Sequence, residues 1–170
     1  ALWSVDEELI VARFAISLGA ARCGGPLWPA EEQLAAAAET LPEPPKEARI
    51  SAIAAIRAGC DPLGERLIAV REPSVRRRFG QVFTPGNIVA PMVEWVLDAS
   101  PSRIVDAGCG SGRFTLSVAR QSAASIIAFD TDPLATLVTR AGLASIGSAT
   151  ATVLNSDYTL AMLPPHDGKT

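Results

Sequence analysis

The amino-acid sequence predicts an α/β fold with a parallel sheet over residues 79–170, preceded by an all-α segment over residues 1–78. Residues 103–112 read as a short strand that runs into three alternating glycines, and a helical pattern follows, as in a βαβ unit. A second apolar run at residues 125–129 supplies the next strand. Residues 1–78 instead carry apolar residues at helical spacing, interrupted by glycine and proline, without a strand pattern.

Four helices are expected in the first segment, over residues 4–18, 29–41, 43–58 and 62–70. Ser4 and Glu7 form a capping-box pattern for the first helix, and Asp61 is placed to cap the last one. The apolar stripes of these helices include Trp3 and Trp28. We expect them to form the core of a small bundle rather than a binding site.

The strand-to-helix turn is the most informative feature for function. Ile104 and Val105 are β-formers, as expected for a parallel strand that is covered on both faces. The helix expected after the turn, residues 113–120, directs its free N–H groups and the positive end of its dipole toward the turn. The main chain can turn sharply there and approach a ligand because three positions lack a Cβ: Gly108, Gly110 and Gly112. A small polar molecule is the expected ligand.

Two carboxylates indicate which small molecule is bound. Asp130 ends the second strand, where it can accept hydrogen bonds from a ribose diol. A surface aspartate beside an ordinary tight turn is the alternative. The glycine spacing is G-x-G-x-G rather than the G-x-G-x-x-G of dinucleotide sites, and Asp106 at the end of the first strand would repel a pyrophosphate. The sequence therefore favours S-adenosylmethionine, which carries sulfonium and ammonium groups, over NAD or FAD.

Four segments of the sequence resemble motifs of the class I methyltransferases, in the variant found in amino-group DNA methyltransferases. They resemble motifs X, I, II and III in that order: residues 80–85, 106–114, 129–133 and 155–158. This order is similar to that of the gamma class of adenine-specific enzymes, which includes fused restriction–modification proteins. The resemblance implies a Rossmann-like class I methyltransferase sheet, of which residues 79–170 would be an incomplete part.

The resemblance also implies how these segments bind S-adenosylmethionine. Residues 83–85 would close over the methionine end, while Asp106 and the glycine loop would hold the amino-acid moiety. Asp130 would bind the ribose hydroxyls, Asp157 the adenine amino group, and Tyr158 would lie against the adenine ring. The full set of implied cofactor residues is Phe83, Thr84, Pro85, Asp106, Gly108, Cys109, Gly110, Gly112, Asp130, Asp157 and Tyr158.

Three of these residues also have simpler structural interpretations. Thr84 followed by Pro85 suits the start of a helix, with the hydroxyl as cap and proline in the first helical position. Asp157 could merely end a strand. The small size of Cys109 suffices to explain its place in the glycine loop.

We assign no catalytic residue and no metal ligand from the sequence. The resemblance implies an (Asn/Asp)-Pro-Pro-(Tyr/Phe) loop that holds an extruded base. The nearest string, residues 163–166, lacks both the polar residue and the aromatic ring. We therefore expect a piece of a longer protein, truncated before the catalytic motif, that binds the cofactor and does not turn over alone.

Composition and charge constrain the cellular location of the protein and its binding partners. Three cysteines without metal-ligand spacing indicate reduced thiols and a cytoplasmic protein. No apolar stretch approaches the roughly 20 residues of a membrane span. The net charge of −3 differs from the positive charge that is typical of DNA-binding proteins. Arg71 and residues 76–78 form a basic cluster, which would either contact phosphate or be a solvated helix end.

The expected function is S-adenosylmethionine-dependent methylation of adenine in DNA, within a restriction–modification system. DNA would be bound by a region after residue 170, and a restriction nuclease would be fused or associated. Two alternatives stay open. One is a methyltransferase acting on RNA or on a protein glutamine, and the other is a non-catalytic helical scaffold with a vestigial cofactor domain.

Overall fold

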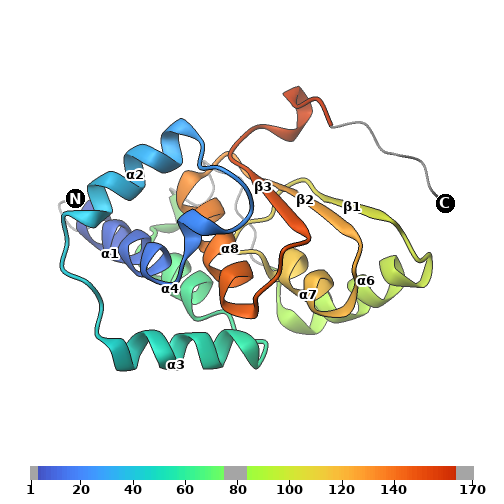
Figure 1. Cartoon of the computed structure of the whole chain (residues 1–170), viewed down its shortest axis with the longest axis horizontal. Helices are drawn as coiled ribbons and strands as arrows, with labels where there is room; N and C mark the ends of the chain where they lie inside the picture. The colour runs from blue at the N-terminus through green and yellow to red at the C-terminus, as the bar shows by residue number, and fades with distance from the viewer. Residues whose placement is uncertain (1–3, 75–83, 164–170) are drawn as a thin grey trace.

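The structure is a computed structural model that describes residues 4–74 and 84–163. The N-terminal helices gather beside α8 at one end of the molecule, and the sheet lies with α6 and α7 at the other end (Figure 1). No helix in these two ranges is long and apolar enough to cross a lipid bilayer. The elements are α1 (Ser4–Ser17), η1 (Ala20–Arg22), α2 (Pro29–Glu39), α3 (Lys46–Arg57), α4 (Pro62–Val70), α6 (Gly86–Asp98), β1 (Arg103–Asp106), α7 (Arg113–Gln121), β2 (Ser125–Phe129), α8 (Pro133–Ile146), β3 (Ala151–Leu154) and η2 (Tyr158–Leu160).

The three strands form a parallel sheet in the order β1–β2–β3, which confirms the α/β fold predicted from the sequence. Ile104 pairs with Ile126, and Ala128 pairs with Val153. Parallel neighbours need a crossover connection, which α7 supplies between β1 and β2 and α8 supplies between β2 and β3. The carboxyl ends of all three strands therefore meet at one edge of the sheet, where an open α/β sheet binds its ligands.

Burial of β1 differs from the sequence expectation. We expected a strand covered on both faces, but all four residues of β1 are only partly buried. The reason is its place at the edge of the described sheet, where it pairs with β2 alone among residues 4–74 and 84–163. β2, which lies between two strands, is buried from Ile126 to Phe129.

One face of the sheet packs against α6, α7 and α8. Side chains alternate along a strand, so Ile126 and Ala128 share a face. They are buried in one cluster with Val93 of α6, Leu116 of α7 and Leu143 of α8. This packing fixes the helix that follows the glycine turn against the strand that precedes Asp130.

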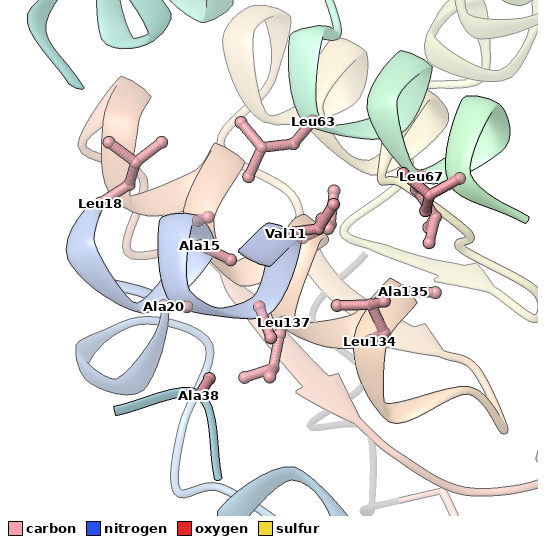
Figure 2. Close-up of a cluster of buried hydrophobic side chains, with 14 of the residues drawn as sticks. Val11, Ala15, Leu18, Ala20, Ala38, Leu63, Leu67, Leu134, Ala135 and Leu137 are labelled. Atoms are coloured by element: carbon pink, nitrogen blue, oxygen red, sulfur yellow. The ribbon is translucent and has the colours of Figure 1, made fainter. Parts of the chain in front are cut away.

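The N-terminal helices pack on the other side of α8. Leu134 and Leu137 of α8 are buried together with residues of α1, α2 and α4 (Figure 2). The labelled members of this cluster are Val11, Ala15, Leu18, Ala20, Ala38, Leu63, Leu67, Leu134, Ala135 and Leu137. Helix α8 therefore serves both the sheet and the helical segment, because it buries apolar side chains on two sides.

The four N-terminal helices are confirmed close to their predicted ranges, and Asp61 does cap α4. The expectation for Trp28 is wrong: its side chain is 37% exposed because it stands at the N-cap position of α2, at the surface of the bundle. Trp3 lies outside the described residues. The domain boundary at residues 78 and 79 also falls outside them and stays a prediction.

Candidate cofactor site

The glycine loop lies between β1 and α7, as the sequence predicts. Gly110 and Gly112 have φ angles of +53° and +87°, a region that L side chains rarely adopt. The loop is closed by a hydrogen bond from the Gly112 amide to the Cys109 carbonyl (2.7 Å). The Cys109 amide donates to the carbonyl of Phe129 (2.8 Å), so the loop is tied to the end of β2.

The glycines of the loop have different structural roles. A Cβ built on Gly108 or Gly110 would meet no atom within 4 Å, so bare main chain faces open space at these two positions. A Cβ on Gly112 would lie 2.9 Å from Thr139 Oγ1 and 3.2 Å from Leu116 Cδ1. The first two therefore leave room for a ligand, whereas Gly112 permits close packing of α7 against α8.

Asp106 lies at the end of β1, as predicted, and its carboxylate is engaged inside the protein. Thr115 Oγ1 donates a hydrogen bond of 2.7 Å to its Oδ2. Burial raises the pKa of the Asp106 carboxyl above its ordinary value, although hydrogen bonds from Thr115 and from the Gly108 amide oppose the shift. The group is thus a partly buried carboxyl beside the loop, held in place by Thr115.

Asp130 follows β2 directly and reaches back to the glycine loop. Its Oδ2 accepts from the Gly110 amide (2.8 Å) and its Oδ1 from the Asp132 amide (2.9 Å). Burial raises the pKa of Asp130; the hydrogen bonds from the Asp132 and Gly110 amides oppose this shift, and the negative charges of Asp132 and Asp106 add to it. Since each carboxylate oxygen can accept more than one hydrogen bond, both retain acceptor capacity for a ligand.

Cys109 is inert in this setting. Its thiol is buried and accepts a weak hydrogen bond from Thr139 Oγ1 (3.6 Å). Burial raises the pKa of Cys109 well above its ordinary value, and the charges of Asp106 and Asp130 add to this shift. The thiol therefore stays protonated, and the interpretation of Cys109 as a small packing residue fits its surroundings. All three cysteines are free thiols.

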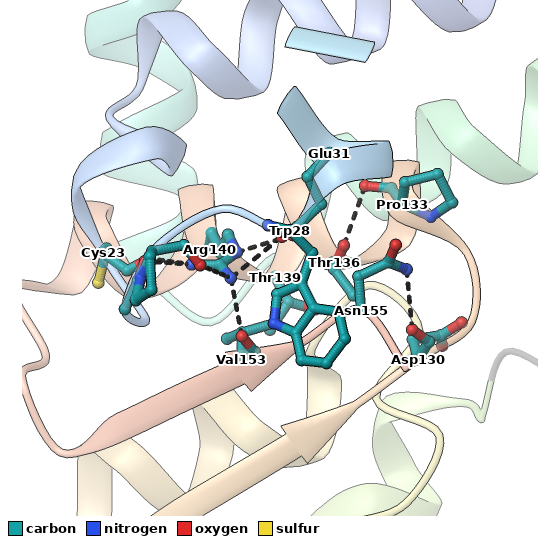
Figure 3. A network of polar contacts seen from close by, with 12 residues as sticks. Cys23, Trp28, Glu31, Asp130, Pro133, Thr136, Thr139, Arg140, Val153 and Asn155 are labelled. Atoms are coloured by element: carbon teal, nitrogen blue, oxygen red, sulfur yellow. Dashed lines mark hydrogen bonds and ion pairs between the residues drawn. The ribbon is translucent and has the colours of Figure 1, made fainter. Parts of the chain in front are cut away.

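The residues after β3 line the same edge of the sheet. Asn155 donates from Nδ2 to the carbonyl oxygen of Asp130 (3.0 Å), which joins the ends of β2 and β3 (Figure 3). The Tyr158 ring packs edge-to-face on Phe129, with ring centroids 5.5 Å apart. Asp157 is exposed, and its Oδ1 accepts from the amide and hydroxyl of Thr159 (2.8 and 2.7 Å). These bonds lower the pKa of Asp157 and cap η2.

The segment predicted to close over the methionine end is described only in part. Phe83 lies outside the described residues. Thr84 is partly buried, and its carbonyl accepts a hydrogen bond from Arg113 Nη1 (3.0 Å). The interpretation of Thr84 as a helix cap is wrong. Helix α6 begins at Gly86 with Pro85 in the N-cap position, and no side chain caps it.

The interpretation of Arg71 as part of an exposed basic cluster is also wrong. The residue is 5% exposed, and its Nε donates to Glu8 Oε1 of α1 (3.0 Å). Its guanidinium also pairs with both oxygens of Asp132, the residue that caps α8 through the Leu134 amide (3.0 Å). Arg71 is therefore a structural link between the N-terminal helices and the loop after β2.

A second buried ion pair was not foreseen from the sequence. Arg140 of α8 and Glu31 of α2 are both fully buried, with Nε and Oε1 2.8 Å apart (Figure 3). Nη2 also donates to Glu31 Oε2 (3.1 Å), and the two terminal nitrogens donate to main-chain carbonyls on two segments: Cys23, Gly25, Pro26 and Val153. A lone charged residue in the apolar sequence of α8 is the only sequence signal for this network, and it does not name the partner.

A third link reaches the glycine loop itself. Asp61, the cap of α4, accepts hydrogen bonds from Ser111 Oγ (2.6 Å) and Arg113 Nε (2.8 Å). The sequence predicts Asp61 as a cap, but nothing in the local pattern connects it to residues 111 and 113. The glycine loop is therefore held from three directions: by β1, by Asp130 after β2, and by the N-terminal helices.

Comparison with known proteins agrees with this geometry. A sequence profile of the ribosomal protein L11 methyltransferase family (PrmA) matches residues 92–159. The chain is 42% identical to the type II methyltransferase M.XamI of Xanthomonas campestris pv. amaranthicola over 113 residues. The aligned part covers 65% of this chain and 20% of that protein. The chain thus spans about a fifth of the length of this relative. No solved structure gives a significant match. Together with the parallel sheet and its glycine loop, these similarities support a class I S-adenosylmethionine-dependent methyltransferase domain over residues 92–159.

Proposed function

We propose that this chain is the S-adenosylmethionine-binding part of a DNA methyltransferase that modifies the amino group of adenine. The observation that carries the proposal is the pairing of bare main chain at Gly108 and Gly110 with two partly buried carboxylates, Asp106 and Asp130, at the ends of β1 and β2. Such a site attracts a cation and disfavours a pyrophosphate. The similarity to a type II methyltransferase supports the DNA substrate.

In this proposal the described residues would hold S-adenosylmethionine as follows. Asp106 and the main chain of the loop would hold the amino-acid moiety, and Asp130 would accept hydrogen bonds from the ribose hydroxyls. Tyr158 presents a partly exposed ring beside the end of β2, where an adenine ring can lie against it. Asp157 is exposed and would accept from the adenine amino group through its second oxygen, since Oδ1 is used by Thr159.

The chemistry supplied by the cofactor is a methyl group on a sulfonium. In the proposed reaction the amino nitrogen of adenine gains that methyl group and loses a proton, and S-adenosylhomocysteine is left. The contribution of the residues in this chain is to bind and orient the donor, which lowers the barrier by converting an encounter into a fixed geometry. We assign no catalytic residue among residues 4–74 and 84–163.

We further propose that most DNA contacts lie outside these 170 residues, because the chain carries a net charge of −3 and its buried Arg71 is unavailable to phosphate. A cytoplasmic location and a place in a restriction–modification system, with a fused or associated nuclease, complete the proposal. The 170 residues alone are expected to bind the cofactor without methylating DNA.

A second candidate is a protein substrate. The profile that matches residues 92–159 is that of the ribosomal protein L11 methyltransferases. This match favours methylation of a protein side chain. The identity of 42% to a type II methyltransferase extends over a longer part of the chain, 113 residues, and we therefore rank DNA first.

Product analysis separates the two candidates. The full-length protein is incubated with methyl-labelled S-adenosylmethionine and either genomic DNA or ribosomal protein L11, and the labelled product is hydrolysed and identified by mass spectrometry. We expect the label in N6-methyladenine from DNA, and none in the protein. Label in another base would refute the adenine assignment, and label in the protein alone would establish the second candidate instead.

A further inference from the structure

One carboxylate of the N-terminal helices contacts the glycine loop of the candidate cofactor site. Asp61 precedes α4 and caps it by accepting from the Gly64 amide at Oδ1 (2.9 Å). Its other oxygen, Oδ2, faces the glycine loop and accepts from Ser111 Oγ (2.6 Å) and Arg113 Nε (2.8 Å). The two oxygens thus have separate tasks: one completes a helix and the other holds a loop that is 50 residues away in the sequence.

Arg113 extends this contact to a third segment. While its Nε donates to Asp61, its Nη1 donates to the Thr84 carbonyl (3.0 Å). The residue lies at the first position of α7, directly after Gly112. A chain of charge-assisted hydrogen bonds therefore joins the N-terminal helices, the glycine loop and the segment that leads into α6.

Local features around Asp61 serve this arrangement. A side chain at position 64 would overlap the Asp61 carboxylate, so glycine at this position lets the carboxylate fold back over the start of α4. Ser111 is nearly fully buried, and the side chains of Asp61 and Arg113 are 16% and 22% exposed. Hydrogen bonds to a charged group in such a partly desolvated place are stronger than those at an open surface.

The glycine loop needs an external support of this kind. Ser111 stands between Gly110 and Gly112, two residues with positive φ and the largest conformational freedom in the unfolded chain. A loop of this composition presents its amides to a ligand in a fixed geometry only where neighbouring groups hold it. The Asp130 carboxylate holds the amide of Gly110 from one side, and Asp61 holds Ser111 and Arg113 from the other.

We propose that Asp61 is a positioning residue for cofactor binding, acting through Ser111 and Arg113. It keeps the glycine loop in the conformation that binds S-adenosylmethionine. The N-terminal helices therefore contribute to cofactor binding and do not form an independent unit. This inference rests on the proposed function, because it assigns the loop a cofactor to receive.

Two conservative variants isolate the loop contact from the helix cap. Asn is as good an N-cap as Asp, so Asp61→Asn retains the bond to Gly64 while it replaces the acceptor that faces Ser111 and Arg113 with an amide donor. Ser111→Ala removes one hydroxyl and leaves Asp61 and the cap in place. Glu65→Gln is the matched control, because it removes one exposed negative charge from the same helix.

The experiment measures the Kd of S-adenosylmethionine by calorimetry for the full-length protein, the three single variants and the double variant Asp61→Asn with Ser111→Ala. We expect each of the two loop variants to raise Kd about tenfold, as for loss of a hydrogen bond to a charged group. The double variant is expected to raise Kd about as much as one single variant, because both disrupt the same contact. Glu65→Gln is expected to leave Kd within about twofold of wild type.

A thermal unfolding curve without ligand accompanies each titration. If Asp61→Asn and Ser111→Ala lower the unfolding midpoint but bind the cofactor as wild type does, Asp61 is a structural residue only and the inference is overturned. Additive effects of the two variants would also overturn it, because Ser111 would then act independently of Asp61. If the wild-type protein itself does not bind S-adenosylmethionine, the proposed function fails, and the inference fails with it.

Discussion

Replacing Arg140 by methionine is expected to lower the free energy of unfolding by about 3–5 kcal/mol, the range for removal of one partner of a buried ion pair. Glu31 would lose its cationic partner in a place with no exposed surface, and four main-chain carbonyls would lose the donor that Arg140 provides. Methionine retains most of the apolar stem, so lost packing contributes little. Figure 3 shows how the guanidinium joins α2, the chain before it and the end of β3.

Chemical denaturation of wild type and variant measures this loss. Arg22→Met is the control, because Arg22 is an exposed residue of η1, and its replacement is expected to change the free energy by no more than about 0.5 kcal/mol. Adding Glu31→Gln to Arg140→Met is expected to recover part of the loss in the free energy of unfolding, since it replaces the unpaired carboxyl with a neutral amide. A loss below about 1 kcal/mol for Arg140→Met would show that the pair is dispensable.

Replacing Gly112 by alanine is expected to lower the free energy of unfolding by about 2–5 kcal/mol and to weaken cofactor binding. The left-handed backbone costs an L residue about 1–2 kcal/mol, and overpacking of a tight site costs a further 1–3 kcal/mol. The overpacking arises because the new methyl group would lie 2.9 Å from Thr139 Oγ1 and 3.2 Å from Leu116 Cδ1. Relief of the contact with Thr139 of α8 requires the start of α7 to move away from α8, and the glycine loop moves with it.

Gly147→Ala separates the cost of the left-handed backbone from the cost of overpacking. Gly147 ends α8 with a φ of +72°, but a Cβ there would meet no atom within 4 Å. Its replacement is expected to cost only the backbone term of about 1–2 kcal/mol and to leave cofactor binding unchanged. Equal losses of stability in the two variants would mean that close packing around Gly112 contributes nothing.

The elements with strong local signals could be predicted from the sequence. α4 begins at Pro62 behind its cap Asp61, and α2 begins at Pro29, because proline suits the first helical position. β2 was found within its predicted range, since a short run of β-branched residues between turns specifies a buried strand. The place of Asp130 at the end of β2 followed from the same pattern.

The polar links between distant segments could not be predicted. Glu31 and Arg140 are 109 residues apart, and Arg71 and Asp132 are 61 apart. Periodicity reports which face of an element is apolar, but it does not report which charge on another element will meet a buried arginine. For the same reason Arg71 was interpreted as an exposed cation.

The exposure of residues at the edges of the structure was also not predicted from the sequence. Trp28 and the two central residues of β1, Ile104 and Val105, are apolar, and this character alone predicted burial at both places. The structure leaves Trp28 partly exposed at the start of α2, and it leaves β1 at the edge of the described sheet. Burial depends on which elements are neighbours, and that information lies in the tertiary arrangement.

Calorimetric titration of the full-length protein with S-adenosylmethionine and, separately, with NAD tests most directly whether the site at Asp106, Asp130 and the glycine loop binds a cationic nucleoside. S-adenosylmethionine is expected to bind and NAD to give no heat, and Asp130→Ala is expected to weaken binding of S-adenosylmethionine by at least about tenfold, as for loss of hydrogen bonds to a charged group. Equal binding of NAD, or an affinity for S-adenosylmethionine that Asp130→Ala leaves unchanged, would contradict this assignment of the site.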